Sequence, residues 1–296
     1  MSHLVRVLRR AVICVTVLGL TAVTATATAH NRPSVIVERI LANINATTDL
    51  ARVKLRFDKL VDPNTDIAKR LAEIDRLAAK VRSARPRPET SRQKLDALRQ
   101  MVYAPGAWNN NRPFRYDLSD PTGQNPKNRL LSTYLDTRKG NCISMPFLFL
   151  VLAERIGLKV AAALAPLHVF VRYTDETGRT FNLESTSGAG FTRDLWYRKH
   201  LPMTDQAIAN GLYLRSLSRR ETAAAMAMIV VEHLIRHGRY TDAIATADAV
   251  LRVFPQLAYA LVKRGTAYGH LIRVHYAEKY MTFNAIPITE RPRLKT

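Results

Sequence analysis

The chain has 296 residues, long enough for about two units of ordinary domain size. It carries 45 Lys and Arg against 24 Asp and Glu, a formal net charge of +21. The two cysteines are Cys14 and Cys142. Loss of an N-terminal segment containing Cys14 would leave Cys142 alone and exclude an intramolecular disulfide.

Residues 1–29 have the pattern of a secretory signal peptide. Three arginines in the first ten residues precede an apolar stretch at 11–23, and Ala27-Thr28-Ala29 fits cleavage before residue 30. We therefore expect an exported, periplasmic protein. An uncleaved membrane anchor is the alternative, because a membrane helix needs about 20 apolar residues. For an exported basic chain we expect no nucleic-acid partner and favour an anionic envelope surface, unless the charge only solvates the protein.

Residues 30–103 are predicted to form an N-terminal helical region. Apolar residues recur at steps of three and four in the segments 37–44, 67–81 and 95–102. The Ala-Arg-Pro-Arg-Pro run at 84–88 breaks this pattern and indicates a connector. No residue of this region suggests chemistry.

Residues 104–200 are predicted to form the core, which begins with a loop rich in Pro, Gly and Asn at 104–128. Because this loop comes shortly before Cys142, it could form one wall of a substrate cleft. Its candidate contacts are Trp108 and Tyr116. The alternative is that both aromatic rings anchor the loop to the body of the protein.

Cys142 is predicted to lie at the start of a buried helix. The apolar run from Phe147 is too long for a typical strand and ends at Gly157, as a helix would. Pro146 requires the regular helix to begin close upstream. Free backbone N–H groups and the helix dipole at that end would stabilise a thiolate and an oxyanion, with Asn141 as a further orienting or oxyanion group. An inert buried thiol is the alternative.

Three short runs after this helix, at 159–165, 167–173 and 181–183, are predicted to be antiparallel strands, which gives an α+β fold. A lone histidine in a strand is more often structural than catalytic. Cysteine hydrolases and acyl transferases, however, need a thiolate, an imidazole and a polar group that orients the imidazole. Cys142, His168 and Glu184 supply these three types in order, with Asn182 as the alternative orienting group.

A loop of small residues at 185–190 follows Glu184 and begins with Ser185. Such a loop could admit an extended substrate chain, and Ser185 is therefore a candidate cleft residue. A simple flexible connection is the alternative.

The run 133–144 around Cys142, the helix end at 152–158, and His168 followed by Glu184 resemble the transglutaminase-like superfamily, in its bacterial branch with tetratricopeptide repeats. The resemblance covers roughly residues 90–200. It implies a papain-like core, with Cys142 as nucleophile, His168 as general acid and base, and the third residue on the next strand. The family usually has Asp at that third position, where this chain has Glu184. Several relatives lack the cysteine.

Residues 201–285 are predicted to be a helical unit. Small residues, aromatic residues and Pro255 in 221–268 follow the spacing of a tetratricopeptide repeat. Because single repeats rarely stand alone, we expect the unit to pack on the core or on the N-terminal helices. His233 and His237 would share a helix face, but no third ligand is evident, so we expect no metal. The residues 286–296 suggest a disordered basic tail.

Two functions fit these observations. The first is an exported cysteine hydrolase or acyl transferase that acts on a protein or peptide substrate through a thioester and needs no cofactor, with hydrolysis favoured because water is always present. The second is a non-catalytic scaffold whose helical repeat binds a protein partner. Reactivity of the Cys142 thiol separates the two.

Overall fold

A computed structural model describes residues 32–84, 90–277 and 279–291. The predicted signal peptide at 1–29, most of the predicted connector at 84–88 and the end of the predicted basic tail lie outside the described residues. Within the described ranges, no helix is both long enough and apolar enough to cross a membrane.

Four helices lie within residues 33–103 of the described chain, and three of them match the predicted helical segments. They are Pro33–Ala42 (α2), Leu50–Val61 (α3), Ile67–Ser83 (α4) and Ser91–Tyr103 (α5). The start of α5 is fixed by a capping box, in which Thr90 and Gln93 bond to each other's backbone N–H groups. Helix α3 was not predicted from the sequence.

Helix α3 was missed because charged residues occupy its buried face. Lys54 and Asp58 form an ion pair with both side chains fully buried. Lys54 Nζ also donates to the carbonyl of Arg129 at 3.2 Å, and Asp58 Oδ2 accepts the Ser132 N–H at 3.0 Å. The pair therefore ties α3 to the segment that leads into helix α6 (Leu131–Thr137).

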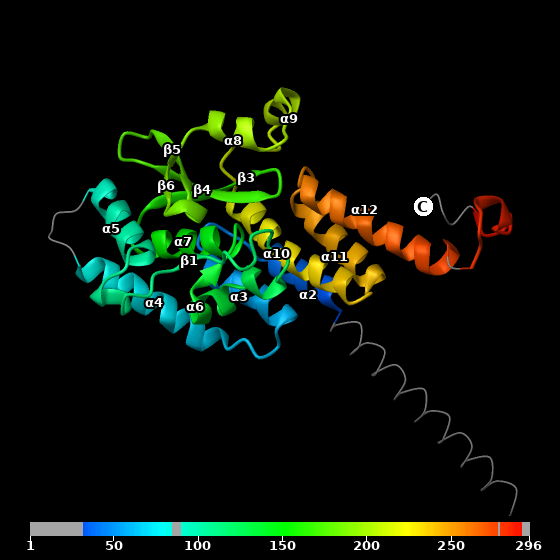
Figure 1. The fold of residues 1–296 in the computed structure, drawn as a ribbon, viewed down its shortest axis with the longest axis horizontal. Coiled ribbons are helices and arrows are strands. Elements are labelled where there is room, and N and C mark those ends of the chain that lie inside the picture. Colours follow the sequence, from blue (N-terminus) through cyan, green and yellow to red (C-terminus); the bar gives the residue numbers. More distant parts are fainter. Residues whose placement is uncertain (1–31, 85–89, 278, 292–296) are drawn as a thin grey trace, which may run out of the picture.

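Helix α7 (Ser144–Arg155) is the centre of the molecule (Figure 1). Every residue from Ser144 to Ala153 is buried. The helix packs against strands on one side and against α3, α4, α5 and α6 on the other. Its start two residues before Pro146 agrees with the sequence prediction.

The main sheet has four antiparallel strands in the order β3-β4-β5-β6. They are Lys159–Ala165 (β3), His168–Thr174 (β4), Thr180–Glu184 (β5) and Gly190–Thr192 (β6). Val169 and Val171 of β4 join the main core with α7, whereas Phe170 packs in a smaller cluster with Tyr197 of helix α8 (Asp194–His200). The sheet thus lies between α7 and α8. A second, parallel pair joins Arg115–Tyr116 (β1) to Lys139–Gly140 (β2).

The remaining helices follow the sheet and are Asp205–Ala209 (α9), Arg219–Arg236 (α10), Tyr240–Val253 (α11) and Ala258–Ile272 (α12). Helix α10 packs on α3, and α11 packs on α2 (Figure 1). The expectation that the C-terminal helices pack on the N-terminal ones is therefore confirmed. That they form a tetratricopeptide repeat stays a prediction. The architecture is mixed α/β with a small antiparallel sheet, which is compatible with the predicted α+β core.

Candidate active site

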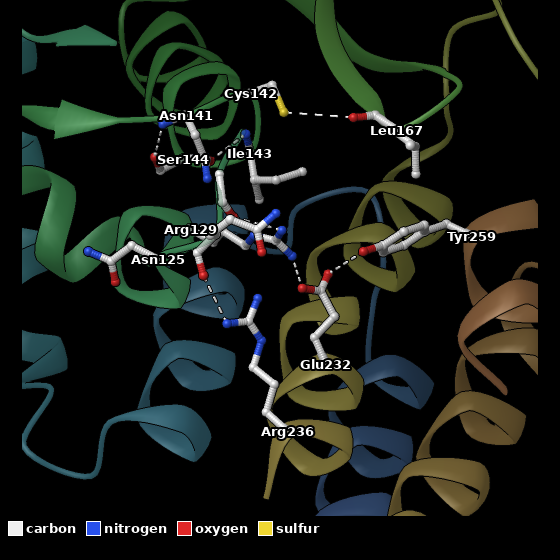
Figure 2. Close-up of polar contacts among 12 residues, drawn as sticks. Asn125, Arg129, Asn141, Cys142, Ile143, Ser144, Leu167, Glu232, Arg236 and Tyr259 are labelled. Carbon is white, nitrogen blue, oxygen red and sulfur yellow. Dashed lines mark hydrogen bonds and ion pairs between the residues drawn. The ribbon is translucent and has the colours of Figure 1, made fainter. Parts of the chain in front are cut away.

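The segment before α7 holds Cys142 in a tightly packed turn (Figure 2). Asn141 is buried, and its Oδ1 accepts the N–H groups of Ile143 at 3.0 Å and Ser144 at 3.4 Å. Ser144 Oγ donates to the carbonyl of Asn128 at 2.6 Å. A side chain at Gly140 would collide with Ser144 Oγ and the Tyr134 ring. Glycine is therefore required there by close packing.

Asn141 acts as a cap of α7, which bears on its predicted role as an oxyanion group. Its carboxamide oxygen is occupied by the two N–H groups of the helix start, and its nitrogen lies beside Gly123. The backbone N–H of Cys142 donates to no other group in the described part of the chain. That N–H is the better candidate to receive an oxyanion.

The Cys142 thiol is partly exposed and faces the turn between β3 and β4. Its Sγ lies 3.7 Å from the carbonyl oxygen of Leu167, as Figure 2 shows. Leu167 adopts a left-handed backbone conformation with φ 56°, and its side chain is 78% exposed. Such a conformation costs a non-glycine residue about 1–3 kcal/mol. The strained turn thus places a carbonyl and an apolar side chain beside the thiol.

His168 and Glu184 are joined across neighbouring strands. His168 Nε2 lies 2.8 Å from Glu184 Oε2. The other carboxylate oxygen of Glu184 accepts the backbone N–H of Thr186 at 3.0 Å and its hydroxyl at 2.6 Å. Tyr197 donates its hydroxyl to Glu184 Oε2 at 2.9 Å. Because Nε2 faces Glu184, the imidazole presents its other nitrogen, Nδ1, to Cys142.

The pKa values of the pair favour an ionised arrangement. Burial lowers the pKa of His168, but hydrogen bonding with Cys142 and Glu184 and their negative charge together raise it to about 9. Burial raises the pKa of Glu184, yet the bonds from His168 and Thr186 hold it below its usual value. At neutral pH the structure therefore supports an imidazolium beside a carboxylate.

Two predicted cleft residues of the 104–128 loop lie in different surroundings. Tyr116 donates its hydroxyl to the carbonyl of Pro121 at 3.1 Å. Burial raises the pKa of Tyr116, and the nearby charge of Cys142 raises it further, so this ring lies close to the thiol. Trp108 packs on the main core, as Tyr116 also does, but it covers Gly106. Trp108 thus follows the loop-anchor alternative.

Two further predicted site residues need correction. Ser185 was expected in an open cleft, but it is completely buried next to Tyr103, because the chain turns inward after β5. Asn182 was the alternative partner of His168. It pairs with Arg172 in the β4–β5 register, and its Nδ2 donates to Asp194 at 2.6 Å. Glu184, and not Asn182, contacts His168.

Thr186 and Tyr197 were missed by the sequence analysis. Thr186 bonds Glu184 from two positions later, a local pattern that the small-residue loop could have revealed. Tyr197 comes from α8 on the far face of the sheet, and no local signal marks it. His233 and His237 stack with ring centroids 4.1 Å apart.

The C-terminal helices also border the site (Figure 2). Arg129 pairs with Glu232 of α10, and Tyr259 of α12 donates its hydroxyl to Glu232 Oε1 at 2.9 Å. Burial raises the pKa of Tyr259, Arg129 lowers it and the charge of Cys142 raises it. Tyr259 therefore lies within electrostatic reach of the thiol. No local sequence pattern indicates this proximity.

The fold and site define a mixed α/β protein with a cysteine at a helix start beside a His–Glu pair. A family model described as the transglutaminase-like superfamily matches residues 68–227, more than half of the chain. The chain belongs to the transglutaminase-like superfamily. The match reaches from α4 into α10 and is thus longer than the resemblance at 90–200.

Comparisons with curated proteins and with solved structures add no further family assignment. No curated protein matches the chain. Among solved structures, the chain is similar to a crystal structure of menin, described as revealing the binding site for Mixed Lineage Leukemia (MLL) protein. The TM-score is 0.43 at 13% identity, and the match covers 83% of this chain and 66% of that one. The chain thus matches less than two thirds of the menin chain.

Proposed function

We propose that the chain is a transglutaminase-like cysteine hydrolase that cleaves a peptide or amide bond through a thioester. The observation that carries the proposal is the His168–Glu184 contact of 2.8 Å, together with the His168 pKa of about 9 beside Cys142. A protonated imidazole at neutral pH can stabilise a thiolate and later donate its proton. Tyr197 and Thr186 hold Glu184, and Glu184 fixes the imidazole.

The reaction proceeds in two steps. The Cys142 thiolate attacks the carbonyl carbon, a C–S bond forms, and the C–N bond breaks as the amine leaves with the proton of His168. The Cys142 N–H stabilises the oxyanion. His168 then takes a proton from water, which attacks the thioester and releases the acid and the thiolate. An amine in place of water would give a new amide.

A second candidate is the non-catalytic scaffold. Leu261 and Val262 of α12 are 48% and 61% exposed, and such apolar groups favour a protein partner on the C-terminal helices. Under either function we propose export to the periplasm, based on the pattern at 1–29.

The pH dependence of Cys142 alkylation by iodoacetamide tests the proposal. We expect half-maximal reactivity well below about pH 8.5, the value for a free cysteine. His168→Ala should move the midpoint up towards that value, and Glu184→Gln should do so in part. Cys142→Ser provides the background rate. A profile like that of a free or buried thiol in all three proteins that retain Cys142 would exclude the hydrolase and leave the scaffold.

A further inference from the structure

Basic side chains from three segments meet on the helical side of Cys142. They are Arg129 before α6, Arg236 of α10 and Lys263 of α12, and we call them the cationic wall. Arg236 donates to the carbonyl of Gln124 at 2.9 Å, and Lys263 Nζ lies 5.1 Å from the centre of the Tyr259 ring. Figure 2 shows Arg129 and Arg236 on the same side of the Cys142 segment as Tyr259. The wall is therefore built around Tyr259, which lies within electrostatic reach of the thiol.

Ion pairs within the described part of the chain balance only one of the three positive charges of this wall. Glu232 neutralises Arg129, and neither Arg236 nor Lys263 has a carboxylate partner in the described part of the chain. The carboxylates of Asp117 and Asp120 are near, but Asn128 and backbone N–H groups hold them.

The surroundings of Lys263 also point to a missing anion. Burial lowers the pKa of the half-buried Lys263, and the charges of Arg129 and Arg236 lower it further. Like charges thus lie together at the edge of the site, and among the described residues Glu232 alone forms an ion pair with them. A ligand carboxylate beside Lys263 and Arg236 would relieve this repulsion, because it accepts hydrogen bonds and carries the opposite charge.

We propose, resting on the hydrolase function above, that the cationic wall binds a carboxylate of the substrate. The chain would then act on an acidic peptide or amide whose carboxylate lies near the bond that Cys142 attacks. Lys263 and Arg236 bind the carboxylate directly. Glu232 and Tyr259 are positioning residues, because they hold Arg129 in place. Substrate choice is thereby assigned to α10 and α12, while the reacting groups lie on α7 and the sheet.

The electrostatic effect of the cationic wall at the Cys142 thiol can be measured without knowing the substrate. Iodoacetate carries a carboxylate and iodoacetamide is neutral, yet both alkylate the same sulfur. A change in thiol reactivity that affects both alkylation rates equally leaves the ratio of the two rates unchanged. At low ionic strength, removal of one positive charge near the thiol should lower the iodoacetate to iodoacetamide ratio roughly two- to three-fold.

The variants are Lys263→Gln, Arg236→Gln and the double variant, with Arg264→Gln as the matched control. Arg264 is the next residue of α12, but it pairs with Asp248 at 3.0 Å. We expect the ratio to fall in both single variants, to fall further in the double variant, and to stay at the wild-type value in Arg264→Gln. Arg236 is exposed, so its variant should fold even if Lys263→Gln does not.

An unchanged ratio in Arg236→Gln and in the double variant would overturn the proposal. So would an equal fall in Arg264→Gln, because the effect would then reflect net charge alone. This outcome is distinct from failure of the hydrolase function, which the iodoacetamide pH profile reports. Because the ratio compares two reagents at one pH, it reports the wall even if the iodoacetamide profile is that of a free thiol.

Discussion

The two sides of Cys142 differ in how far their polar groups are satisfied. On the sheet side, Glu184 is buried and receives hydrogen bonds from His168, Thr186 and Tyr197. On the helical side, Arg236 and Lys263 keep charges that no described carboxylate neutralises. A closed network fixes the geometry of reacting groups, whereas unpaired charge suits the binding of a ligand. Under the proposed function, the sheet side would carry the chemistry and the helical side the recognition of the substrate.

The largest predicted effect concerns the buried Lys54–Asp58 ion pair, which supports the helical side through its contacts with Arg129 and Ser132. Lys54→Met leaves Asp58 charged and unpaired in the core and removes a bond to the Arg129 carbonyl. We expect a loss of about 3–5 kcal/mol in the free energy of unfolding, measured by urea denaturation.

The matched control for this change is the double variant Lys54→Met, Asp58→Asn. Its neutral amide can still accept the Ser132 N–H, so most of the lost stability should return. A Lys54→Met variant as stable as the wild type would show that this ion pair does not support the fold at Arg129 and Ser132.

The sheet side should also respond to pH. The pKa of His168 is about 9 in the folded chain against an ordinary value of 6.5. Its contribution is therefore fully present below about pH 6.5 and is lost as pH rises through about 9, and it amounts to about 3 kcal/mol of the free energy of unfolding. Thermal unfolding across this interval should show the loss in the wild type and a flatter profile in His168→Gln. Equal slopes would contradict the assignment.

The position of Cys142 can be disturbed without changing any polar group. Gly140→Ala places a methyl group against Ser144 Oγ and the Tyr134 ring and should cost about 1–3 kcal/mol. It should also slow alkylation of Cys142. Gly265→Ala is the control, because space around Gly265 in α12 is open and alanine favours a helix. If both variants behaved alike under denaturation, close packing at Gly140 would be refuted.

The smallest effect concerns Tyr197. Tyr197→Phe removes one hydrogen bond to Glu184 but keeps the ring stacked on Phe170, with centroids 4.3 Å apart. We expect the free energy of unfolding to fall by about 1 kcal/mol. The midpoint of the His168 titration should also be lower. Tyr240→Phe, whose hydroxyl has no partner among the described residues, should change neither quantity. If Tyr197→Phe changed neither quantity, the Tyr197 hydroxyl would not be needed to hold Glu184.

Local patterns predicted the elements that carry the reacting groups, but not the contacts between distant segments. The apolar run after Cys142 and the strand alternation around His168 are properties of adjacent residues, so α7 and β4 could be anticipated. Helix α3 was hidden because Lys54 pairs with Asp58 inside the core. Tyr259 could not be found, because its approach to Cys142 depends on how α12 packs.

The corrections have the same origin. Ser185 belongs to a loop of small polar residues, a composition typical of the surface, yet tertiary packing buries it. The alternation of β5 puts Asn182 and Glu184 on one face and could not decide which of them meets His168. The strand register places Asn182 opposite Arg172. Glu184 is therefore the residue that contacts His168.

The proposed function requires that His168 is held as an imidazolium between Cys142 and Glu184. An NMR titration of the His168 ring in the wild type, Cys142→Ser and Glu184→Gln tests it directly. We expect an apparent pKa near about 9 in the wild type, and lower values in both variants because each loses a negative or hydrogen-bonding partner. A wild-type value near the ordinary 6.5, unchanged in both variants, would contradict the claim.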